Sequence, residues 1–331
     1  MESIVEVFKM LLCSSVCFVV YGFAQNSIAN SKENELLIRR FESLYEPSAA
    51  VAVEGRGIFL FEDDGPEMMS LHGVVEDDSG LLLKTQYTGS VHFDVTDIEG
   101  AVKGEKGTVF VVTSHSLNKN GERSDKREQL IQLNVNKKKG IDLLGRVGLR
   151  EAIIAELLKI EPSMSDRKNE INIEGLSFSR AGNVLMIGLR NPLYKGNAII
   201  LQLENPYEIV TEKFIPNFSP KPLLLNIGGA GVRAMTFHEG LGQYFLVSEV
   251  ETKKGKMRPR LWSWDGKKEH APVRINFPGL KKLKNIEALT FFRYEKKDMA
   301  LFVCDDGKKE KKQGAHYAIV EVGQLQMHDK P

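Results

Sequence analysis

Charged residues stand at matching places in a repeated motif of this 331-residue chain. Glu99, Glu174 and Glu287 each lie directly before a small residue and an apolar segment, and Arg233 takes the same place in another copy. Polar residues also follow the next apolar run of each copy, and these are Asp63, Asp64, His115, Arg190, Glu249, Asp305 and Asp306. Carboxylates in such numbers, with arginines among them, predict a site for a cation and an anionic group.

The chemistry of these side chains suggests which of them would bind which group. Carboxylates crowded together raise one another's pKa values unless a cation intervenes, and hard oxygen ligands suit Ca²⁺ or Mg²⁺. A guanidinium can bind a phosphate or a carboxylate with two parallel hydrogen bonds. The predicted metal ligands are Glu99, Glu174, Glu287, Asp305 and Asp306. The predicted ligand-binding residues are Arg190, Arg233 and His115.

Each of these residues also has a simpler structural explanation. A glutamate at the start of a strand could accept hydrogen bonds from the backbone of a neighbouring repeat, and Asp63 and Asp64 could belong to a turn. Arg190 and Arg233 could form salt bridges with the same carboxylates. His115 could be a satisfied surface or channel histidine. The sequence alone leaves both explanations open.

A glycine-rich segment precedes the copy that contains Arg233. Gly228-Gly229-Ala230-Gly231 resembles a glycine-rich phosphate loop, but neither the helix nor the lysine of a P-loop accompanies it. A close crossing of the backbone at this point is the interpretation that the sequence favours.

The motif belongs to a repeat that occurs five times. Each copy has a small residue, an apolar segment, a turn and a second short apolar run bounded by Gly, Asp or Asn. Such runs are typical of strands buried on both faces. Units of about 45–50 residues with about four strands are typical of β-propeller blades. The small residues of the five copies are Ala50, Gly100, Gly175, Ala234 and Ala288.

We therefore predict an all-β fold, a five-bladed β-propeller that forms a single domain over residues 25–331. One helix is expected as an insertion near 149–161, because apolar residues recur there at helical spacing and Pro162 follows. The last copy has room for only three strands, so the segment 36–41 is expected to supply the fourth and close the ring. Alternatives are a sixth, degenerate blade within 137–172 and a pair of β-sandwich domains.

The composition is that of a globular protein that does not depend on nucleic acid. Hydrophobic residues make up 42% of the chain and charged residues 27%, which is usual for a folded domain. The net charge of +1 argues against nucleic acid as an obligate partner, because such binding needs a basic surface with many phosphate contacts. We expect a small anionic molecule or a protein ligand at the channel face instead.

The N-terminus predicts export. Residues 10–20 form a short apolar run, and Gly22-Phe23-Ala24 offers the small residues that a signal peptidase needs. We predict a signal peptide over residues 1–24, cleaved after Ala24, and a periplasmic or secreted mature protein. A translation start at Met10 would explain the acidic residues before the run. An uncleaved anchor is the alternative, but the run is short for a spanning helix of about 20 residues, so we expect no stable membrane span in the mature form.

Several motifs together resemble one known family. They are Asp97-Ile98-Glu99-Gly100, Ile173-Glu174-Gly175-Leu176, Gly188-Leu189-Arg190-Asn191-Pro192, Gly228-Gly229-Ala230-Gly231-Val232-Arg233 and Glu287-Ala288-Leu289. Over roughly residues 45–325 the chain resembles the bacterial domain-of-unknown-function family 3616, which is more distantly similar to the esterase-like domain associated with some phytases. The resemblance implies a propeller and an exported protein, and it implies no catalytic residues.

The sequence supports two functions. The first is a metal-dependent hydrolase of a phosphate or carboxylic ester with its site at the channel mouth, because a cation with nearby arginines can bind and polarise such an ester. The second is a non-catalytic propeller that binds a ligand or a partner protein through the same face.

Overall fold

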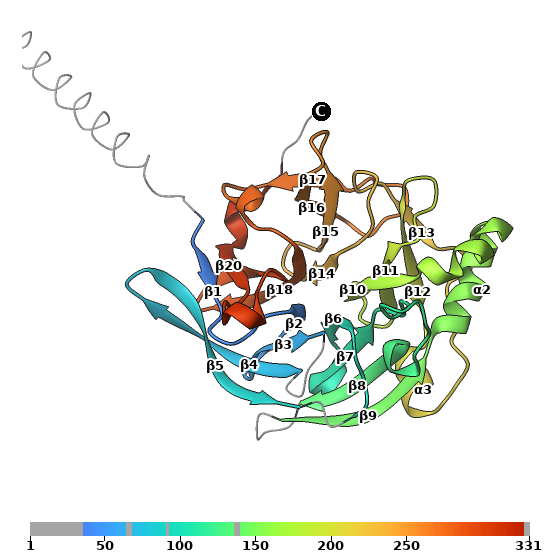
Figure 1. Cartoon of the computed structure of the whole chain (residues 1–331), viewed down its shortest axis with the longest axis horizontal. Coiled ribbons are helices and arrows are strands. Elements are labelled where there is room, and N and C mark those ends of the chain that lie inside the picture. Colours follow the sequence, from blue (N-terminus) through green and yellow to red (C-terminus); the bar gives the residue numbers. More distant parts are fainter. Residues whose placement is uncertain (1–35, 64–67, 91–92, 136–139, 328–331) are drawn as a thin grey trace, which may run out of the picture. The chain divides into compact units, whose positions relative to one another are not determined.

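Five antiparallel sheets form the blades of a propeller, as Figure 1 shows. A computed structural model describes residues 36–63, 68–90, 93–135 and 140–327. The innermost strands of the blades are β2 (Pro47–Val53), β6 (Ile98–Lys103), β10 (Asn172–Phe178), β14 (Ala234–His238) and β18 (Ile286–Tyr294). Each of these strands packs beside the next, and β18 packs beside β2, so the ring is closed. The prediction of a five-bladed propeller is confirmed.

The remaining strands of each blade follow outwards from the inner strand. The first blade continues with β3 (Gly57–Glu62), β4 (Met69–Asp77) and β5 (Gly80–Gly89), and the second with β7 (Thr108–Thr113), β8 (Gln129–Val135) and β9 (Ile141–Gly148). The third continues with β11 (Leu185–Asn191), β12 (Ala198–Leu203) and β13 (Leu223–Leu225). The fourth has β15 (Gln243–Glu251), β16 (Met257–Trp264), β17 (Val273–Asn276) and the short β21 (Gln326–Met327), and the fifth has β19 (Lys297–Cys304) and β20 (His316–Glu321).

A strand from the start of the described chain completes the fifth blade. β1 (Ile38–Arg40) pairs antiparallel with β20, with Arg40 opposite His316. Arg39 also reaches the hairpin of the first blade, where its Nε donates to the Leu81 carbonyl at 3.0 Å and its Nη2 lies 3.0 Å from Asp77 Oδ1. The prediction that the segment 36–41 closes the ring is confirmed.

The core lies between neighbouring blades, which explains why the second strand of each copy is apolar throughout. In β3, Phe59 and Phe61 pack into the cluster shared with the second blade, whereas Ile58 and Leu60 pack into the cluster shared with the fifth. Successive strand residues point to opposite faces, so a strand covered on both sides needs a continuous apolar run. The short runs in the sequence follow from this arrangement.

Helices occupy the connections between strands. Leu149 alone separates the end of β9 at Gly148 from α2 (Arg150–Ile160). The buried residues Ile153 and Leu157 of α2 join the core between the second and third blades. The predicted helix is confirmed. The alternative of a sixth blade within 137–172 is wrong, because β9 completes the second blade and η3 (Pro162–Glu170) follows α2. The other helices are α3 (Pro206–Thr211), η1 (Glu105–Gly107), η2 (Asp125–Arg127), η4 (Leu280–Lys282), η5 (Lys309–Lys311) and η6 (Val322–Gln324).

The predicted signal peptide, residues 1–24, lies outside the described residues. Within the part of the chain that the structure describes, none of the helices has the length and apolar character needed to cross a membrane.

Candidate functional site

One residue at the start of each inner strand stands at the same place around the central channel. β6 pairs Ile98 with Thr113 and then Gly100 with the residue before Thr113, so Glu99 is the extra residue of a β-bulge. The same irregularity recurs in β2, β10 and β18, and the residue before β14 takes the corresponding place. We call these five residues the rim ring: Ser48, Glu99, Glu174, Arg233 and Glu287.

Arg233 is the buried cation of the rim ring. Its side chain is 4% exposed, its Nε lies 3.3 Å from Glu174 Oε2, and its Nη2 pairs with Glu287 Oε1. Nη2 also donates to Asn285 Oδ1. Burial opposes the charge of Arg233, but Glu174 and Glu287 outweigh it and raise the pKa of the guanidinium. Arg233 therefore links the third, fourth and fifth blades and neutralises part of the ring.

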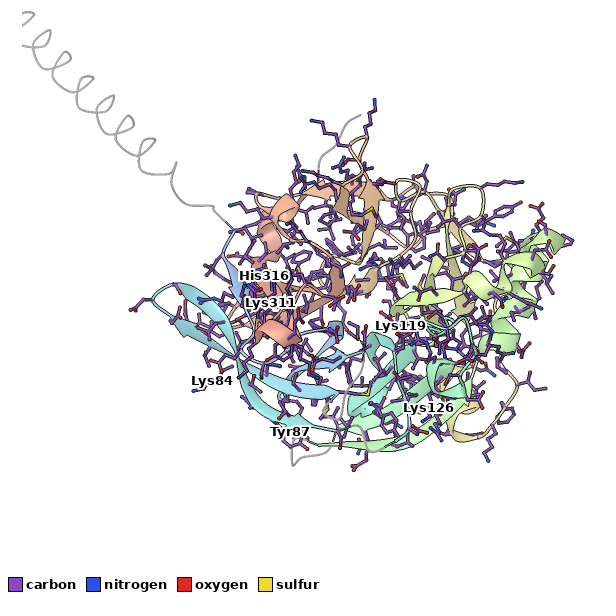
Figure 2. The ribbon with its side chains drawn as sticks, in the orientation of Figure 1. Lys84, Tyr87, Lys119, Lys126, Lys311 and His316 are labelled. Atoms are coloured by element: carbon purple, nitrogen blue, oxygen red, sulfur yellow. The ribbon has the colours of Figure 1, made fainter. Side chains whose placement is uncertain are left out.

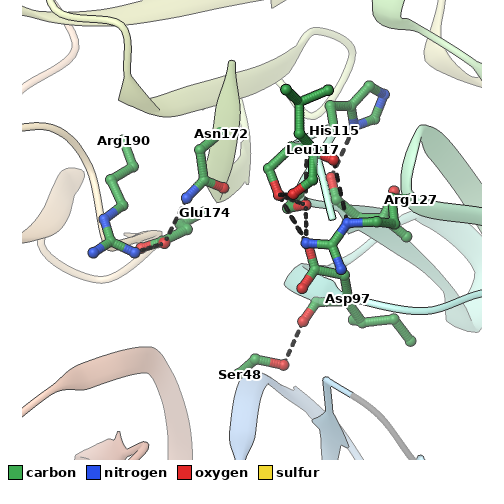
Figure 3. Close-up of polar contacts among 12 residues, drawn as sticks. Ser48, Asp97, His115, Leu117, Arg127, Asn172, Glu174 and Arg190 are labelled. Carbon is green, nitrogen blue, oxygen red and sulfur yellow. Dashed lines mark hydrogen bonds and ion pairs between the residues drawn. The ribbon is translucent and has the colours of Figure 1, made fainter. Parts of the chain in front are cut away.

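Arg190, in β11, is bound by the same carboxylate but remains accessible. Its Nη1 lies 2.6 Å from Glu174 Oε1, which also accepts a hydrogen bond from Asn172 Nδ2 at 3.2 Å (Figure 3). Unlike Arg233, the Arg190 side chain is 42% exposed. A ligand at the rim could therefore reach a guanidinium whose position Glu174 already determines.

Glu99 lies near the positive charge of Arg233 but forms no ion pair with it. It is 9% exposed, and no hydrogen bond or ion pair joins its side chain to another described residue. One carboxylate oxygen from each of Asp63, Asp97 and Glu99 lies within 4.8 Å of the others, and we call these three residues the acidic cluster. Burial, followed by the negative charges of Glu174 and Asp63, raises the pKa of Glu99 well above its usual range. The cluster has the hard oxygen donors that a divalent cation prefers.

Asp97 completes the acidic cluster, although the repeat pattern predicted only Glu99 of this motif as a site residue. It lies two residues before Glu99 with a left-handed backbone, φ 64°, and Asn285 has the same place before Glu287 with φ 52°. Asp and Asn tolerate this conformation better than most residues. The carboxylate of Asp97 pairs with Arg127 (Figure 3). The recurrence of a short polar residue two positions before the glutamate is the signal that could have identified it.

The two acids after β19 have separate partners. Asp305 accepts a hydrogen bond from Asn285 Nδ2 at 2.9 Å, and burial, together with the nearby Glu46, raises its pKa to about 6. Asp306 Oδ2 lies 2.6 Å from His316 Nδ1, and the His316 backbone N–H donates to Asp306 Oδ1 at 2.8 Å. His316, labelled in Figure 2, belongs to the fifth blade. Asp305 therefore adjoins the rim ring, whereas Asp306 is bound to β20. Asp64 lies outside the described residues.

A small pocket lies between the inner strands. Four members of the rim ring line it, all except Arg233, and small or apolar residues such as Ala49, Gly100 and Leu176 form the rest of the wall. Its volume is about 220 Å³ only when space open to solvent is included, and the enclosed part has room for little more than one water molecule or ion. The pocket therefore suits an ion or one small chemical group.

The family of the chain is shown by a sequence comparison. A model of the family described as "Protein of unknown function (DUF3616)" matches residues 108–320, which is more than half of the chain. The chain belongs to this family. No curated protein matches the chain.

Solved structures resemble the protein in fold. A GH43 β-1,3-galactosidase with galactodeoxynojirimycin is 10% identical, with a TM-score of 0.50 over 87% of this chain and 92% of that one. An exo-β-1,3-galactanase from Phanerochaete chrysosporium is 9% identical, with a TM-score of 0.49 over 89% and 67%. The soluble aldose sugar dehydrogenase from Escherichia coli is 10% identical, with a TM-score of 0.43 over 86% and 99%. At identities this low, the resemblance extends to the fold alone. The function of the protein must therefore be inferred from its own residues.

His115 lies apart from the other predicted site residues of this family member. Its side chain is fully buried, and its Nδ1 lies 2.8 Å from the Thr113 carbonyl oxygen, to which it donates in the neutral ring. Its backbone carbonyl accepts a hydrogen bond from Arg150 of α2. Burial lowers the pKa of the imidazole to about 4, so the ring is neutral at pH 7. The structure thus connects His115 to α2 and places Glu99, Glu174 and Glu287 around the pocket, while Arg233 binds two of these carboxylates without lining it.

Proposed function

We propose that the protein is a metal-dependent hydrolase of small phosphate or carboxylic esters, with its site at the mouth of the central channel. The observation that carries the proposal is the acidic cluster beside the rim ring, where Glu99 forms no ion pair or hydrogen bond with a described residue. Glu174 adds its negative charge to Glu99 and also binds Arg190. Glu174 therefore lies near both the acidic cluster, which can bind a cation, and Arg190, which can bind an anion.

The side chains present fit Ca²⁺ or Mg²⁺ with a ligand set that shares only Glu99 with the five ligands predicted from the sequence. Glu174 and Glu287 already bind Arg233, and Asp306 binds His316. The acidic cluster, Asp63, Asp97 and Glu99, would hold the cation, because its carboxylate oxygens converge and a hard divalent ion prefers such oxygens. A cation bound there would share the Asp97 carboxylate with Arg127. A cation bound there supplies Lewis-acid polarisation of the ester oxygen and favours attack by water.

The chain's own residues would bind and orient the substrate. The exposed guanidinium of Arg190 is the group that can bind the anionic part of an ester, since two parallel N–H donors match two oxygens of a phosphate or carboxylate. Glu174 positions Arg190 through the 2.6 Å ion pair. Arg233 is too deeply buried to reach a ligand, and its role is to neutralise Glu174 and Glu287.

Metal analysis of the purified protein tests the proposal. We expect about one bound divalent cation per chain after dialysis, lost in Glu99→Gln and retained in Asp306→Asn. The second variant removes an acid after β19 that His316 already engages, so it is a matched control. Cation-dependent turnover of p-nitrophenyl phosphate or p-nitrophenyl acetate should show a raised KM in Arg190→Gln. Absence of bound cation in the wild type, with a melting temperature that chelator does not change, would refute the proposal.

One observation favours a non-catalytic ligand-binding propeller as the second candidate. Ser48 has the only hydroxyl group in the rim ring, and it donates to the Ile98 carbonyl, so the ring offers no free hydroxyl as a nucleophile. A protein that binds the cation and phenyl phosphate but hydrolyses neither phenyl phosphate nor the two p-nitrophenyl esters would fit this candidate.

A further inference from the structure

The glycine-rich segment of the sequence lies between two arginines. It connects β13 to β14, and a Cβ added at Gly231 would lie 1.9 Å from the Arg190 carbonyl oxygen. A Cβ added at Gly228, which has φ 84°, would lie 2.9 Å from Arg260 Nη1. Only glycine allows the backbone to approach both residues this closely. The expected close crossing of the backbone is therefore present, and Gly228 lies against the guanidinium of Arg260.

Arg260 and Arg274 form a cationic pair that has no acidic partner among the described residues. Strand pairing sets Trp262 opposite Arg274, and residues two apart on β16 share a face, so Arg260 and Arg274 lie on the same face of the fourth blade. No hydrogen bond or ion pair joins either side chain to another described residue. Burial and the charge of Arg274 lower the pKa of Arg260.

The acids of the fourth blade do not neutralise this pair. Glu249 is paired with Pro259 in the sheet and therefore lies on the opposite face from Arg260, and Glu251, two residues further, shares the face of Glu249. Like charges held side by side repel one another. The cationic pair consequently favours a bound anion.

The glycine-rich loop is fixed at its base and offers free backbone donors at its tip. Trp262 Nε1 donates to Ser248 Oγ at 2.9 Å, and Ser248 Oγ donates to the Ile227 carbonyl at 2.9 Å. Beyond this anchor, the Gly228 N–H donates to Asn226 Oδ1 at 3.0 Å, whereas the N–H groups of the exposed Gly229 and the half-buried Ala230 make no hydrogen bond to any described residue. Successive backbone N–H groups in a turn with left-handed residues are a common way to bind anions.

We propose that the glycine-rich loop, residues 227–231, and Arg260 bind a phosphate group, with Arg274 adding a second positive charge. The group is inorganic phosphate or the phosphate of an ester. Two guanidinium groups and a set of backbone donors suit a tetrahedral dianion better than a carboxylate, because a phosphate group has more acceptor oxygens and close to two negative charges. The site is separate from the acidic cluster and does not depend on a cation.

Calorimetric titration with inorganic phosphate, on protein kept in chelator, tests the site. We expect Arg260→Gln to weaken phosphate binding by about tenfold or more, since a charge-assisted hydrogen bond contributes about 1.5–3 kcal/mol. Arg274→Gln, which removes the exposed charge, should have a smaller effect. Arg258→Gln is the matched control, because it removes the same charge from the same face of β16, but its Nη1 donates to the Lys281 carbonyl at 3.2 Å. Its phosphate affinity should equal that of the wild type.

Two further variants keep the proposal testable if Arg260→Gln fails to fold. Arg260→Lys retains the charge but loses the planar fork, and Gly229→Ala strains a residue with φ 74° that has open space around it. Both should weaken phosphate binding while melting near the wild-type temperature. Phenyl phosphate as a second titrant distinguishes the sources. If it binds as tightly as inorganic phosphate, the site accepts esters, and if it does not bind, the site is for the free ion.

Three results would overturn the inference. They are no heat of binding with phosphate at millimolar concentration, equal binding of acetate and phosphate, and equal weakening by Arg258→Gln and Arg260→Gln. The outcome is independent of the proposed hydrolase. Glu99→Gln should abolish cation binding and leave phosphate affinity unchanged, so the two proposals can fail separately.

Discussion

Removing Arg233 should destabilise the protein far more than removing Arg190, although both arginines bind Glu174. Arg233 is almost fully buried, and its partners Glu174 and Glu287 are 2% and 10% exposed. Removal of one partner from a buried ion pair typically costs about 3–5 kcal/mol, because the other charge stays buried without compensation. An ion pair with one exposed partner, as in Arg190, contributes at most about 1 kcal/mol. We therefore expect Arg233→Met to lose about 3 kcal/mol or more and Arg190→Met to lose about 1 kcal/mol or less.

The loss in Arg233→Met should also depend on pH. Burial already raises the pKa of Glu287 in the folded protein, and Arg233 opposes that rise. Without Arg233 the folded pKa rises further above the unfolded value, so the unfolded state loses its proton first as pH increases. Stability then falls with rising pH, at up to about 1.4 kcal/mol per pH unit for one group. The difference between Arg233→Met and the wild type should be smaller at pH 5 than at pH 8.

Equilibrium denaturation in urea at pH 5, 7 and 8 measures both effects. The triple variant Arg233→Met/Glu174→Met/Glu287→Met is a control, because it removes the buried charges together and should recover part of the stability. Equal losses in Arg233→Met and Arg190→Met, or a loss in Arg233→Met that is the same at all three pH values, would show that Arg233 is not the buried counter-charge of the ring.

Two other parts of the chain make separate predictions. His72 is 1% exposed, and burial lowers its pKa from 6.5 to about 4. The unfolded state therefore takes up the proton first as pH falls, and about 3 kcal/mol of stability should be lost between pH 6.5 and pH 4. His72→Gln should lack that part of the pH dependence in urea denaturation, and an unchanged dependence would contradict the assignment. We also propose that the protein is exported, so mass spectrometry of the mature chain should find Gln25 as its first residue, and an intact residue 1 or 10 would contradict cleavage after Ala24.

Local patterns were sufficient to predict the architecture. Runs such as Ile58 to Phe61 must be covered on both faces, and their fivefold recurrence with similar spacing predicts equivalent blades. The segment 36–41 could be assigned to the last blade because that copy has too few strands. The helix near 149–161 follows from its apolar spacing and from Pro162. These features depend on neighbours in the chain, so they can be derived without knowledge of distant contacts.

The roles of the site residues could be predicted only in part. The sequence places Glu99, Glu174, Glu287 and Arg233 at equivalent strand starts, and the structure brings these four together. The sequence could not distinguish Glu99, which forms no ion pair with a described residue, from Glu174 and Glu287, which bind Arg233. The distinction depends on contacts between residues that lie more than 50 positions apart.

The sequence by itself determined the propeller repeat, the closing strand and the ring of charged strand starts, because strand periodicity and repeat spacing are local properties. It favoured five blades and left a sixth open, and the structure excluded the sixth. Only the tertiary structure decided which charges meet. Asp306 binds His316, the backbone carbonyl of His115 accepts a hydrogen bond from Arg150 of α2, and Arg260 lies beside the glycine-rich loop and Arg274. These contacts join different strands, loops and helices, so the pattern of residues along one strand does not predict them.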